Sequence, residues 1–284
     1  MRAAEECRDT TTSEATTSDT PLWRRIATKA YMVACQYQET GLVLLVLVAA
    51  WQLLSTMGVF SRLLLPAPTS IVGVILSNAA EFGAHTWVTI KEVILGYALG
   101  LGVGLVLGVA IAYSRVLEKV LYPLMVVSQN MPHIALGPIL VVWLGFGMEP
   151  KLALVALITF FPVTLSTVDA LKSVDPEMLR FVRSLGATEW QMFHKIKVPH
   201  SLPYLFTGIK VSATYGVLAA VVGEWVGSQF GLGHLMLTSH RAMKTDFVFA
   251  TVMVMSLVGM AMFVGAALLE RVMIPWHHAM RERT

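Results

Sequence analysis

The chain has 284 residues, of which 56% are hydrophobic and only 14% charged, and its mean hydropathy is +0.67. Soluble domains carry about 25% charged residues, so this composition excludes a soluble globular protein and predicts a chain that lies in a lipid bilayer. The formal net charge of +3 is small and no dense basic stripe is present, which excludes a nucleic-acid-binding protein.

Residues 1–38 are expected to form a cytoplasmic tail. Their first part, residues 1–20, is rich in Thr and Ser and contains no apolar run, so it is predicted to be disordered. Residues 39–84 then supply the first transmembrane helix and an outer interfacial segment. Pro66 and Pro68 are expected to end the first helix, with a short amphipathic helix following as far as Ala80.

Apolar runs long enough to cross the hydrocarbon core, which takes about 20 residues, recur along the chain. They are Leu42–Phe60, Val93–Ser114, Val120–Met148, Leu152–Val168, Pro203–Val226 and Phe247–Leu269. The predicted fold class is an all-α integral membrane protein with six transmembrane helices, short interfacial helices and a cytoplasmic two-helix coupling loop. An even number of crossings places both termini on one side of the membrane.

The distribution of Lys and Arg sets the predicted orientation, because these residues accumulate on the cytoplasmic side of a membrane. With both termini inside, 15 of the 21 Lys and Arg residues lie in cytoplasmic segments, five lie outside, and Lys210 lies within a span. The polar segment between the fourth and fifth runs, residues 175–203, therefore faces the cytoplasm. It is called the island below.

A glycine pattern marks the second run. Gly96, Gly100, Gly104 and Gly108 recur at every fourth position, which places them on one face of a helix. Small residues on one face let another helix approach closely. The pattern therefore predicts tight packing of this helix against a neighbour.

The third run is predicted to be a broken helix. Pro123, Pro132 and Pro138 each remove a backbone donor and favour a kink. Irregular backbone at membrane depth is tolerated only where protein or a water-filled cavity covers it. The break can therefore line a solute path, or it can consist of kinks that pack against neighbouring helices without a path.

Polar side chains in the third and fourth runs are the candidates for lining such a path. They are Gln129, Asn130, His133 and Thr159. Polar groups inside a bilayer are costly and often functional, although hydrogen bonding between helices is the commoner role of Ser, Thr, Asn and Gln. Glu224, near the outer end of the fifth run, is expected to be solvated or paired with a Lys or Arg.

The island carries strong signals for two short helices joined by a tight turn. Asp175 can cap a helix that begins with a proline, and Gly186 is expected to end that helix in the left-handed conformation. Thr188 and Gln191 can form the capping box of a second helix, which Pro199 and Pro203 are expected to end. Such a rigid unit can dock a partner protein, or it can lie on lipid as an amphipathic connector.

Here the sequence resembles a known family. Gly186, Ile196 and Pro199, with Val198 in place of a leucine, match the Gly-x9-Ile-x-Leu-Pro half of the EAA loop of bacterial ABC importer permeases. The likeness extends over residues 85–270 and includes the stretch PILVVWLGFG. It is similar to the nitrate, sulfonate and taurine branch of the binding-protein-dependent transport inner-membrane family, which also contains permeases for thiamine precursors and riboflavin.

The resemblance implies the transmembrane permease subunit of an ATP-driven importer, multi-pass in the bacterial cytoplasmic (inner) membrane with both termini cytoplasmic. Two permeases, as a homodimer or a pair, would form the solute pathway. Two cytoplasmic ABC ATPases would dock on the coupling loop, and an extracytoplasmic binding protein would deliver the solute. The chain would be non-catalytic and hold no cofactor or metal, since ATP and magnesium are used by the ATPase. The residues assigned to ATPase coupling are Arg180, Phe181, Val182, Arg183, Gly186, Ala187, Ile196 and Pro199.

One departure from the family concerns the three residues that give the EAA loop its name. Their positions hold Arg180, Phe181 and Val182, so the family's acidic contact to the ATPase is absent or replaced. Arg180 or Arg183 is expected to meet acidic residues of the ATPase instead. The implied domains are a permease core over 85–270, with five transmembrane helices and the coupling loop 172–202, and a cytoplasmic tail over 271–284.

Other functions remain to be weighed against this one. No GxxxxGK[ST] phosphate loop is present, so the chain cannot hydrolyse ATP by that route. An ion-gradient-driven secondary transporter would carry buried carboxylates at mid-membrane, and a membrane enzyme would carry clustered His, Asp and Glu, of which the island offers only the separate His194 and His200. The solute stays open between nitrate-, sulfonate- or taurine-like compounds and thiamine precursors or riboflavin.

Overall fold

The computed structural model describes residues 40–58, 61 and 63–275. The chain divides into two compact units, Met1–Ser70 and Ile71–Thr284. The predicted N-terminal tail, and all but the first residues of the predicted C-terminal tail, lie outside the described residues.

In the first unit, the helix Thr40–Thr56 corresponds to the predicted span Leu42–Phe60 and ends a little earlier. Side chains near its end bind the backbone of the segment 65–66. Trp51 donates from Nε1 to one of these carbonyls at 3.1 Å, and the Ser55 hydroxyl donates to the other at 2.9 Å. The segment after the helix is therefore held against it by bonds that satisfy backbone carbonyls lying outside any helix.

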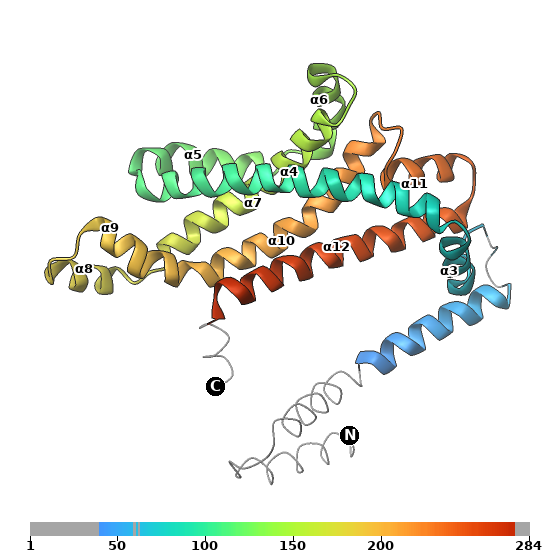
Figure 1. Cartoon of the computed structure of the whole chain (residues 1–284), viewed down its shortest axis with the longest axis horizontal. Coiled ribbons are helices and arrows are strands. Elements are labelled where there is room, and N and C mark those ends of the chain that lie inside the picture. Colours follow the sequence, from blue (N-terminus) through green and yellow to red (C-terminus); the bar gives the residue numbers. More distant parts are fainter. Residues whose placement is uncertain (1–39, 59–60, 62, 276–284) are drawn as a thin grey trace, which may run out of the picture. The chain divides into compact units, whose positions relative to one another are not determined.

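From α3 onward the described residues form helices joined by turns (Figure 1). In chain order they are α3 (Pro68–Ser77), α4 (Ala79–Tyr113), α5 (Arg115–Ser128), η1 (His133–Ala135), α6 (Leu136–Leu144), α7 (Glu149–Lys172), α8 (Pro176–Ser184), α9 (Glu189–Met192), η2 (Phe193–Lys197), α10 (Val198–Trp225), α11 (Leu232–Arg241) and α12 (Thr245–Met273). Among the described residues, four stretches are long and apolar enough to cross a membrane, and they are α4, α7, the continuous helix Glu189–Trp225 and α12.

The four long helices form the body of the second unit. Helix α7 packs along both α4 and α10, and α12 packs against α10. Between α10 and α12 the core contains Phe206, Ile209, Ala213 and Ala266, all buried. The island lies at one end of these helices and α11 at the other (Figure 1).

The predicted close packing of the glycine face is confirmed. All four glycines of the stripe are buried between α4 and α7. A Cβ atom on Gly96 would lie 2.6 Å from Cβ of Val155, and one on Gly104 would lie 2.9 Å from Cγ1 of Val163. Because real Cβ atoms do not approach neighbours so closely, any larger residue would push the two helices apart.

Helix α4 begins much earlier than predicted. It starts at Ala79, whereas the apolar run suggested Val93, and the predicted domain boundary between residues 84 and 85 falls inside it. The charged residue Glu92 was expected at the entrance of the span. It lies within the helix instead, buried and paired through Oε1 with Lys151.

The predicted break in the third run is confirmed. Helix α5 ends at Ser128, and α6 begins only at Leu136 after a turn and the short 3-10 helix η1. Pro132 lies in this gap and has no amide to donate. With 14 and nine residues, neither α5 nor α6 has the length of a span. The predicted total of six crossings thus includes this broken segment and the shorter helix of the first unit.

One prediction about the island is wrong. Pro199 and Pro203 do not end its second helix, since α9 continues through the π-helical turn η2 into α10 without interruption, and Pro203 lies inside α10. Pro199 therefore lies inside a continuous helix, although it has no amide to donate to a carbonyl of the preceding turn. The amide of Val198 instead donates to the carbonyl of Phe193, five residues back. Such local widening of the helix to a π-helical turn is expected where a proline ring would collide with the carbonyl four residues earlier.

Candidate functional site

The island is held together by its own caps. The Asp175 carboxylate accepts a hydrogen bond from the amide of Glu177 at 2.8 Å, at the start of α8. Gly186 follows the end of α8 with φ of +86°, in the left-handed region. Thr188 and Gln191 then form the predicted capping box of α9. These bonds satisfy amides that a helix start leaves without partners, so the turn between the two helices is well defined.

One face of the island is apolar and exposed. Met178, Phe181 and Leu185, on one side of α8, are exposed by 50%, 65% and 71%, and Trp190 at the start of α9 is exposed by 70%. A contiguous exposed apolar face marks a surface that contacts a partner or a membrane. The coupling residue Phe181 therefore lies where a partner can reach it.

The two arginines of the island differ in their surroundings. Arg183 forms an ion pair through Nη2 with Oε1 of Glu189, which links α8 to α9 across the turn. Arg180 lies 4.0 Å from Glu177 and its Nε donates to the carbonyl of Pro176 at 3.3 Å, both within α8. Arg180 is the more exposed of the two, so it is the arginine better placed to meet an acidic partner.

A hollow of 380 Å³ opens in the bend of the island. Four of the predicted coupling residues line it, namely Val182, Gly186, Ala187 and Ile196. The structure therefore brings predicted coupling residues of both helices to one place, although the outermost two are separated by 14 positions in the chain. Pro199 lies outside this hollow, in the first turn of α10.

The junction between the island and α10 is tied to α4 through aromatic contacts. Phe193 meets Tyr113 edge to face with ring centres 5.3 Å apart, and Nζ of Lys197 lies 4.8 Å from the centre of the Tyr113 ring. Trp190 packs on His194 one turn along. The island is thus attached to the end of α4 as well as to its own helix.

The predicted pathway residues fall in two different settings. Gln129 and Asn130 are exposed at the break between α5 and α6, and Nδ2 of Asn130 donates to the carbonyl of Val126 at 3.1 Å. His133 begins η1 beside them. The structure therefore groups these three positions at the one irregular stretch of the third run.

Thr159 does not belong with them. It is fully buried between α4 and α7, facing Gly100, and its hydroxyl donates to the carbonyl of Val155 at 2.8 Å. Its hydroxyl group is hydrogen-bonded within its own helix, and its side chain packs against α4. The structure thus places Thr159 in the interface between α4 and α7.

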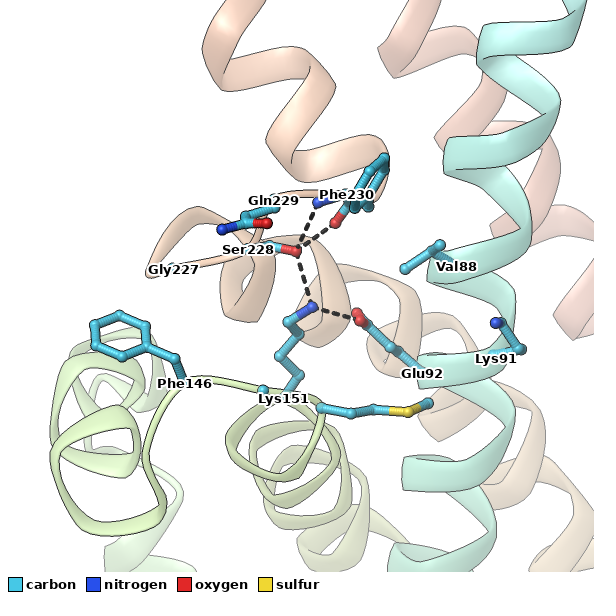
Figure 2. Close-up of a pocket in the computed structure, with 11 residues that line it drawn as sticks. Val88, Lys91, Glu92, Phe146, Lys151, Gly227, Ser228, Gln229 and Phe230 are labelled. Atoms are coloured by element: carbon cyan, nitrogen blue, oxygen red, sulfur yellow. Dashed lines mark hydrogen bonds and ion pairs between the residues drawn. The ribbon is translucent and has the colours of Figure 1, made fainter.

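A polar cluster that was not predicted lies at the end of the helices opposite the island. We call it the distal cluster, and it consists of Thr89, Glu92, Lys151, Glu224 and Ser228. Figure 2 shows Lys151 reaching between Glu92 and Ser228 at the wall of a 460 Å³ cavity. Its Nζ lies 2.6 Å from Oε1 of Glu92 and 2.8 Å from Oγ of Ser228. The cluster therefore joins α4, α7 and the segment after α10.

The same end of α4 also holds the turn that leads into α11. The Glu224 carboxylate accepts hydrogen bonds from the Thr89 hydroxyl at 2.6 Å and from the amide of Gly233. The Thr89 hydroxyl oxygen accepts the amide of Leu232 at 2.9 Å, and Nδ1 of His85 lies 3.0 Å from the amide nitrogen of Gly231. Thr89 of α4 and Glu224 of α10 thus satisfy the first two amides of α11, a helix start that has no side-chain cap of its own.

The expectation for Glu224 was wrong. Its side chain is 1% exposed and is bound by a hydroxyl and a backbone amide, so it is not solvated, and no Lys or Arg of the described residues pairs with it. One signal in the sequence could have revealed the site. His85, Thr89 and Glu92 are spaced as one helix face, and Gly96 continues that face into the glycine stripe.

No metal centre is found in the described part of the chain. No group of three or more His, Cys, Asp or Glu residues there lies close enough to hold a metal ion. The cavity at the distal cluster is lined by an ion pair, a hydroxyl and aromatic side chains. These polar groups can bind a polar solute, or they can hold the ends of the helices together.

Proteins with similar sequences are named as transport permeases. The chain is 35% identical over 246 residues to the formylaminopyrimidine transport permease protein ThiX of Halalkalibacterium halodurans, covering 85% of this chain and 96% of that protein. It is 33% identical to the putative aliphatic sulfonates transport permease protein SsuC of Bacillus subtilis, covering 82% of this chain and 86% of that protein.

Among solved structures, the fold resembles a chain of the MetNI methionine ABC transporter in inward-facing conformations. The TM-score is 0.58 at 18% identity, covering 66% of this chain and 93% of that chain. This likeness supports the helical arrangement. Together, the spanning helices and these matches define a transmembrane permease of an ABC importer, the class that the sequence resemblance predicted.

The particular family follows from a match over most of the spanning region. Residues 100–275 match the binding-protein-dependent transport system inner membrane component family, and the chain belongs to that family. It is therefore a multi-pass inner-membrane permease that works with an ATPase and a binding protein. It is not itself an enzyme, since the ATPase is a separate subunit. The alternative of an ion-gradient-driven secondary transporter is thereby excluded.

Proposed function

We propose that this permease forms a solute pathway together with a second permease subunit, and that a cytoplasmic ATPase drives it through the island. The observation that carries the proposal is the island itself. It is a capped two-helix unit at one end of the spanning helices, with exposed apolar residues and a hollow lined by the predicted coupling residues. A rigid surface of this kind transmits force from a docked partner, whereas a flexible connector does not.

The orientation is part of the proposal. The island would face the cytoplasm and both termini would lie on the same side, because most Lys and Arg residues then fall inside. An extracytoplasmic binding protein would deliver the solute at the other end, where the distal cluster and its cavity lie. ATP binding would move the island and switch the pathway between its two openings.

The pathway is proposed to run along the broken segment between α5 and α6. Gln129 and Asn130 are exposed there, and Val142, Trp143 and Phe146 on and after α6 are about 80% exposed. Interrupted backbone at membrane depth must be covered by protein or by a water-filled cavity. A second copy of this chain would supply that cover, and a homodimer is the simplest such assembly.

The solute is proposed to belong to one of the classes transported by its relatives. The names of these relatives include sulfonates, taurine, formylaminopyrimidine and riboflavin. Selectivity in such a system depends on the binding protein as well as on the permease. The ligand of a binding protein encoded beside this chain would therefore identify the class.

Docking is tested by shortening an exposed phenylalanine on the island. Phe181→Ala is expected to lower co-purification of the ATPase and ATP-driven uptake by about tenfold or more, as for a central interface residue. Phe263→Ala on α12 is the matched control, because Phe263 is also exposed but lies away from the island. Equal retention of the ATPase by both variants would contradict docking through α8.

The proposed role of the island arginines, which stand in for the family's acidic contact to the ATPase, is tested separately. Arg180→Glu is expected to weaken assembly with the ATPase directly, and Arg183→Glu to weaken it by releasing Glu189 and loosening the turn. Complex assembly and uptake are measured for each variant. Unchanged assembly and uptake in both variants would show that neither arginine replaces the missing acidic contact.

Pairing of two permeases is tested by cross-linking. After the two native cysteines are replaced by serine, the variant Val142→Cys is expected to form a disulfide between copies in membranes. Leu257→Cys, at an exposed position on α12, is the control and is expected to remain monomeric. The opposite pattern would place the contact between copies on α12.

A further inference from the structure

The buried charges of the distal cluster do not balance. Glu92 and Glu224 are 2% and 1% exposed, and the one ammonium group among them, that of Lys151, is 11% exposed. If all three groups were ionised, this buried site would carry one uncompensated negative charge. An unpaired charge inside a protein is strongly destabilising, so a further positive charge is required.

The hydrogen bonds show the same deficit. Both carboxylate oxygens of Glu224 accept bonds, from Thr89 and from the amide of Gly233. Oε1 of Glu92 accepts from Lys151, but its Oε2 is buried and has no hydrogen-bond partner among the described residues. A buried acceptor without a donor carries the full penalty of its lost hydration. One donor is therefore missing, and it is missing at Oε2 of Glu92.

The two carboxyl groups lie close to each other. Thr89 and Glu92 are three residues apart on α4 and share one face of the helix. Thr89 binds Glu224 directly, and the carboxyl groups of Glu92 and Glu224 interact electrostatically. On the α10 side, Gly223 lies against the side chain of Lys151. The missing donor can thus be a hydrogen between two carboxyl oxygens.

We propose that Glu92 and Glu224 bind one proton between them, held at Oε2 of Glu92 and donated toward the Glu224 carboxyl group. This single proton supplies the missing donor and cancels the excess charge. The distal cluster is then a proton-binding site that fastens α4 to α10 and to the turn before α11. Lys151 completes it by joining α7 and Ser228 to the same carboxyl group.

Other titratable groups on the elements packed here were considered as sources of the missing charge. They are His85 and Lys91 on α4, Glu149 and Lys151 on α7, His234 on α11, and Lys244 and Asp246 at the start of α12. In the described part of the chain, Lys151 is the one that donates to a carboxyl oxygen of the pair. Lys91 also interacts electrostatically with Glu92, but it is exposed, with its Nζ 5.9 Å from the Trp87 ring, so water screens its charge more than that of the buried Lys151.

The pH dependence follows from the charge count. While the proton is bound, the three buried groups are neutral overall. When it leaves at alkaline pH, two carboxylates face one ammonium and the distal ends of α4 and α10 repel each other. In the unfolded chain both carboxyl groups are ionised at neutral pH, so the folded state holds the extra proton and its stability falls as the pH rises.

The test uses Glu92→Gln, with Glu270→Gln as the matched control. The new glutamine would accept from Lys151 through its oxygen and donate to Glu224 through its amide, reproducing the protonated acid without a proton. Glu270 is paired one to one with Lys210 at 2.7 Å, in a similarly buried setting. Its replacement leaves a lysine without its partner. The full chain is purified in lipid nanodiscs for infrared spectroscopy and thermal unfolding.

Wild-type protein is expected to show the carbonyl stretch of a protonated carboxylic acid at neutral pH. Glu92→Gln is expected to lose the intensity of one such group, while Glu270→Gln keeps it. The unfolding temperature of wild type is expected to fall with rising pH, and that of Glu92→Gln to fall less. An unchanged infrared band in Glu92→Gln would overturn the proposal, as would a loss of stability as large as that of Glu270→Gln.

Discussion

The glycine stripe allows a sharp test of how α4 and α7 are held together. Gly100→Ala would place a Cβ atom 2.6 Å from the carbonyl oxygen of Ala156 and 3.1 Å from its Cα. Both are backbone atoms of α7 and cannot rotate away, so the two helices must separate. Overpacking of this kind costs about 1–3 kcal/mol, which exceeds the roughly 1 kcal/mol that alanine gains over glycine in a helix.

Gly102→Ala is the control for the same helix. Gly102 is exposed, and a Cβ there would meet no atom within 4 Å. It should therefore show only the gain in helix propensity. The two variants are expected to differ by about 2 kcal/mol, or roughly 6 °C in unfolding temperature, measured by thermal unfolding in detergent or nanodiscs. Equal unfolding temperatures would refute close packing of α4 on α7 at this position.

Three further predictions concern the island. Thr188→Ala is expected to cost about 1 kcal/mol of local stability by removing the cap of α9, seen as faster amide exchange in the turn, with Thr188→Ser as the conservative control. Arg183→Glu alone is expected to speed amide hydrogen exchange in the turn, and the double variant Arg183→Glu with Glu189→Arg is expected to slow it again by restoring an ion pair. No recovery in the double variant would show that the ion pair does not order the turn. Pro199→Ala restores an amide donor to the first turn of α10 and is expected to shorten the π-helical turn, detected as a changed distance between spin labels on α8 and α12; an unchanged distance would assign the turn to another cause.

Local signals explain why the island could be predicted almost completely. A cap depends on a side chain and an amide two or three residues away, so Asp175, Gly186 and Thr188 carry their structural role in the sequence itself. The end of the second helix was misjudged for the same reason. Pro199 reads as a stop signal locally, but the helix continues because a π-helical turn accommodates the proline.

The distal cluster could not be predicted in this way because its partners lie far apart in the sequence. Thr89 and Glu224 are separated by 135 positions, and Lys151 lies 59 positions from Glu92. A prediction from hydropathy takes charged residues as the limit of a membrane span. The predicted span therefore began at Val93, after Glu92, although α4 begins at Ala79. Only the folded arrangement shows that Glu92 is buried and paired with Lys151 inside the protein.

The two sites of this permease lie at the two ends of one continuous helix. The stretch Glu189–Trp225 begins in the island and ends beside the distal cluster, and it is 37 residues long. At 1.5 Å per residue it extends over roughly 55 Å. Because α7 is fixed to α4 by the glycine stripe, a displacement of the island would be transmitted along this helix rather than absorbed by its neighbours. Among the described residues its hydrogen bonding is interrupted near the island, by the π-helical turn and by Pro199 and Pro203, which have no amide. Bending is therefore expected there, while Glu224 holds the far end to α4.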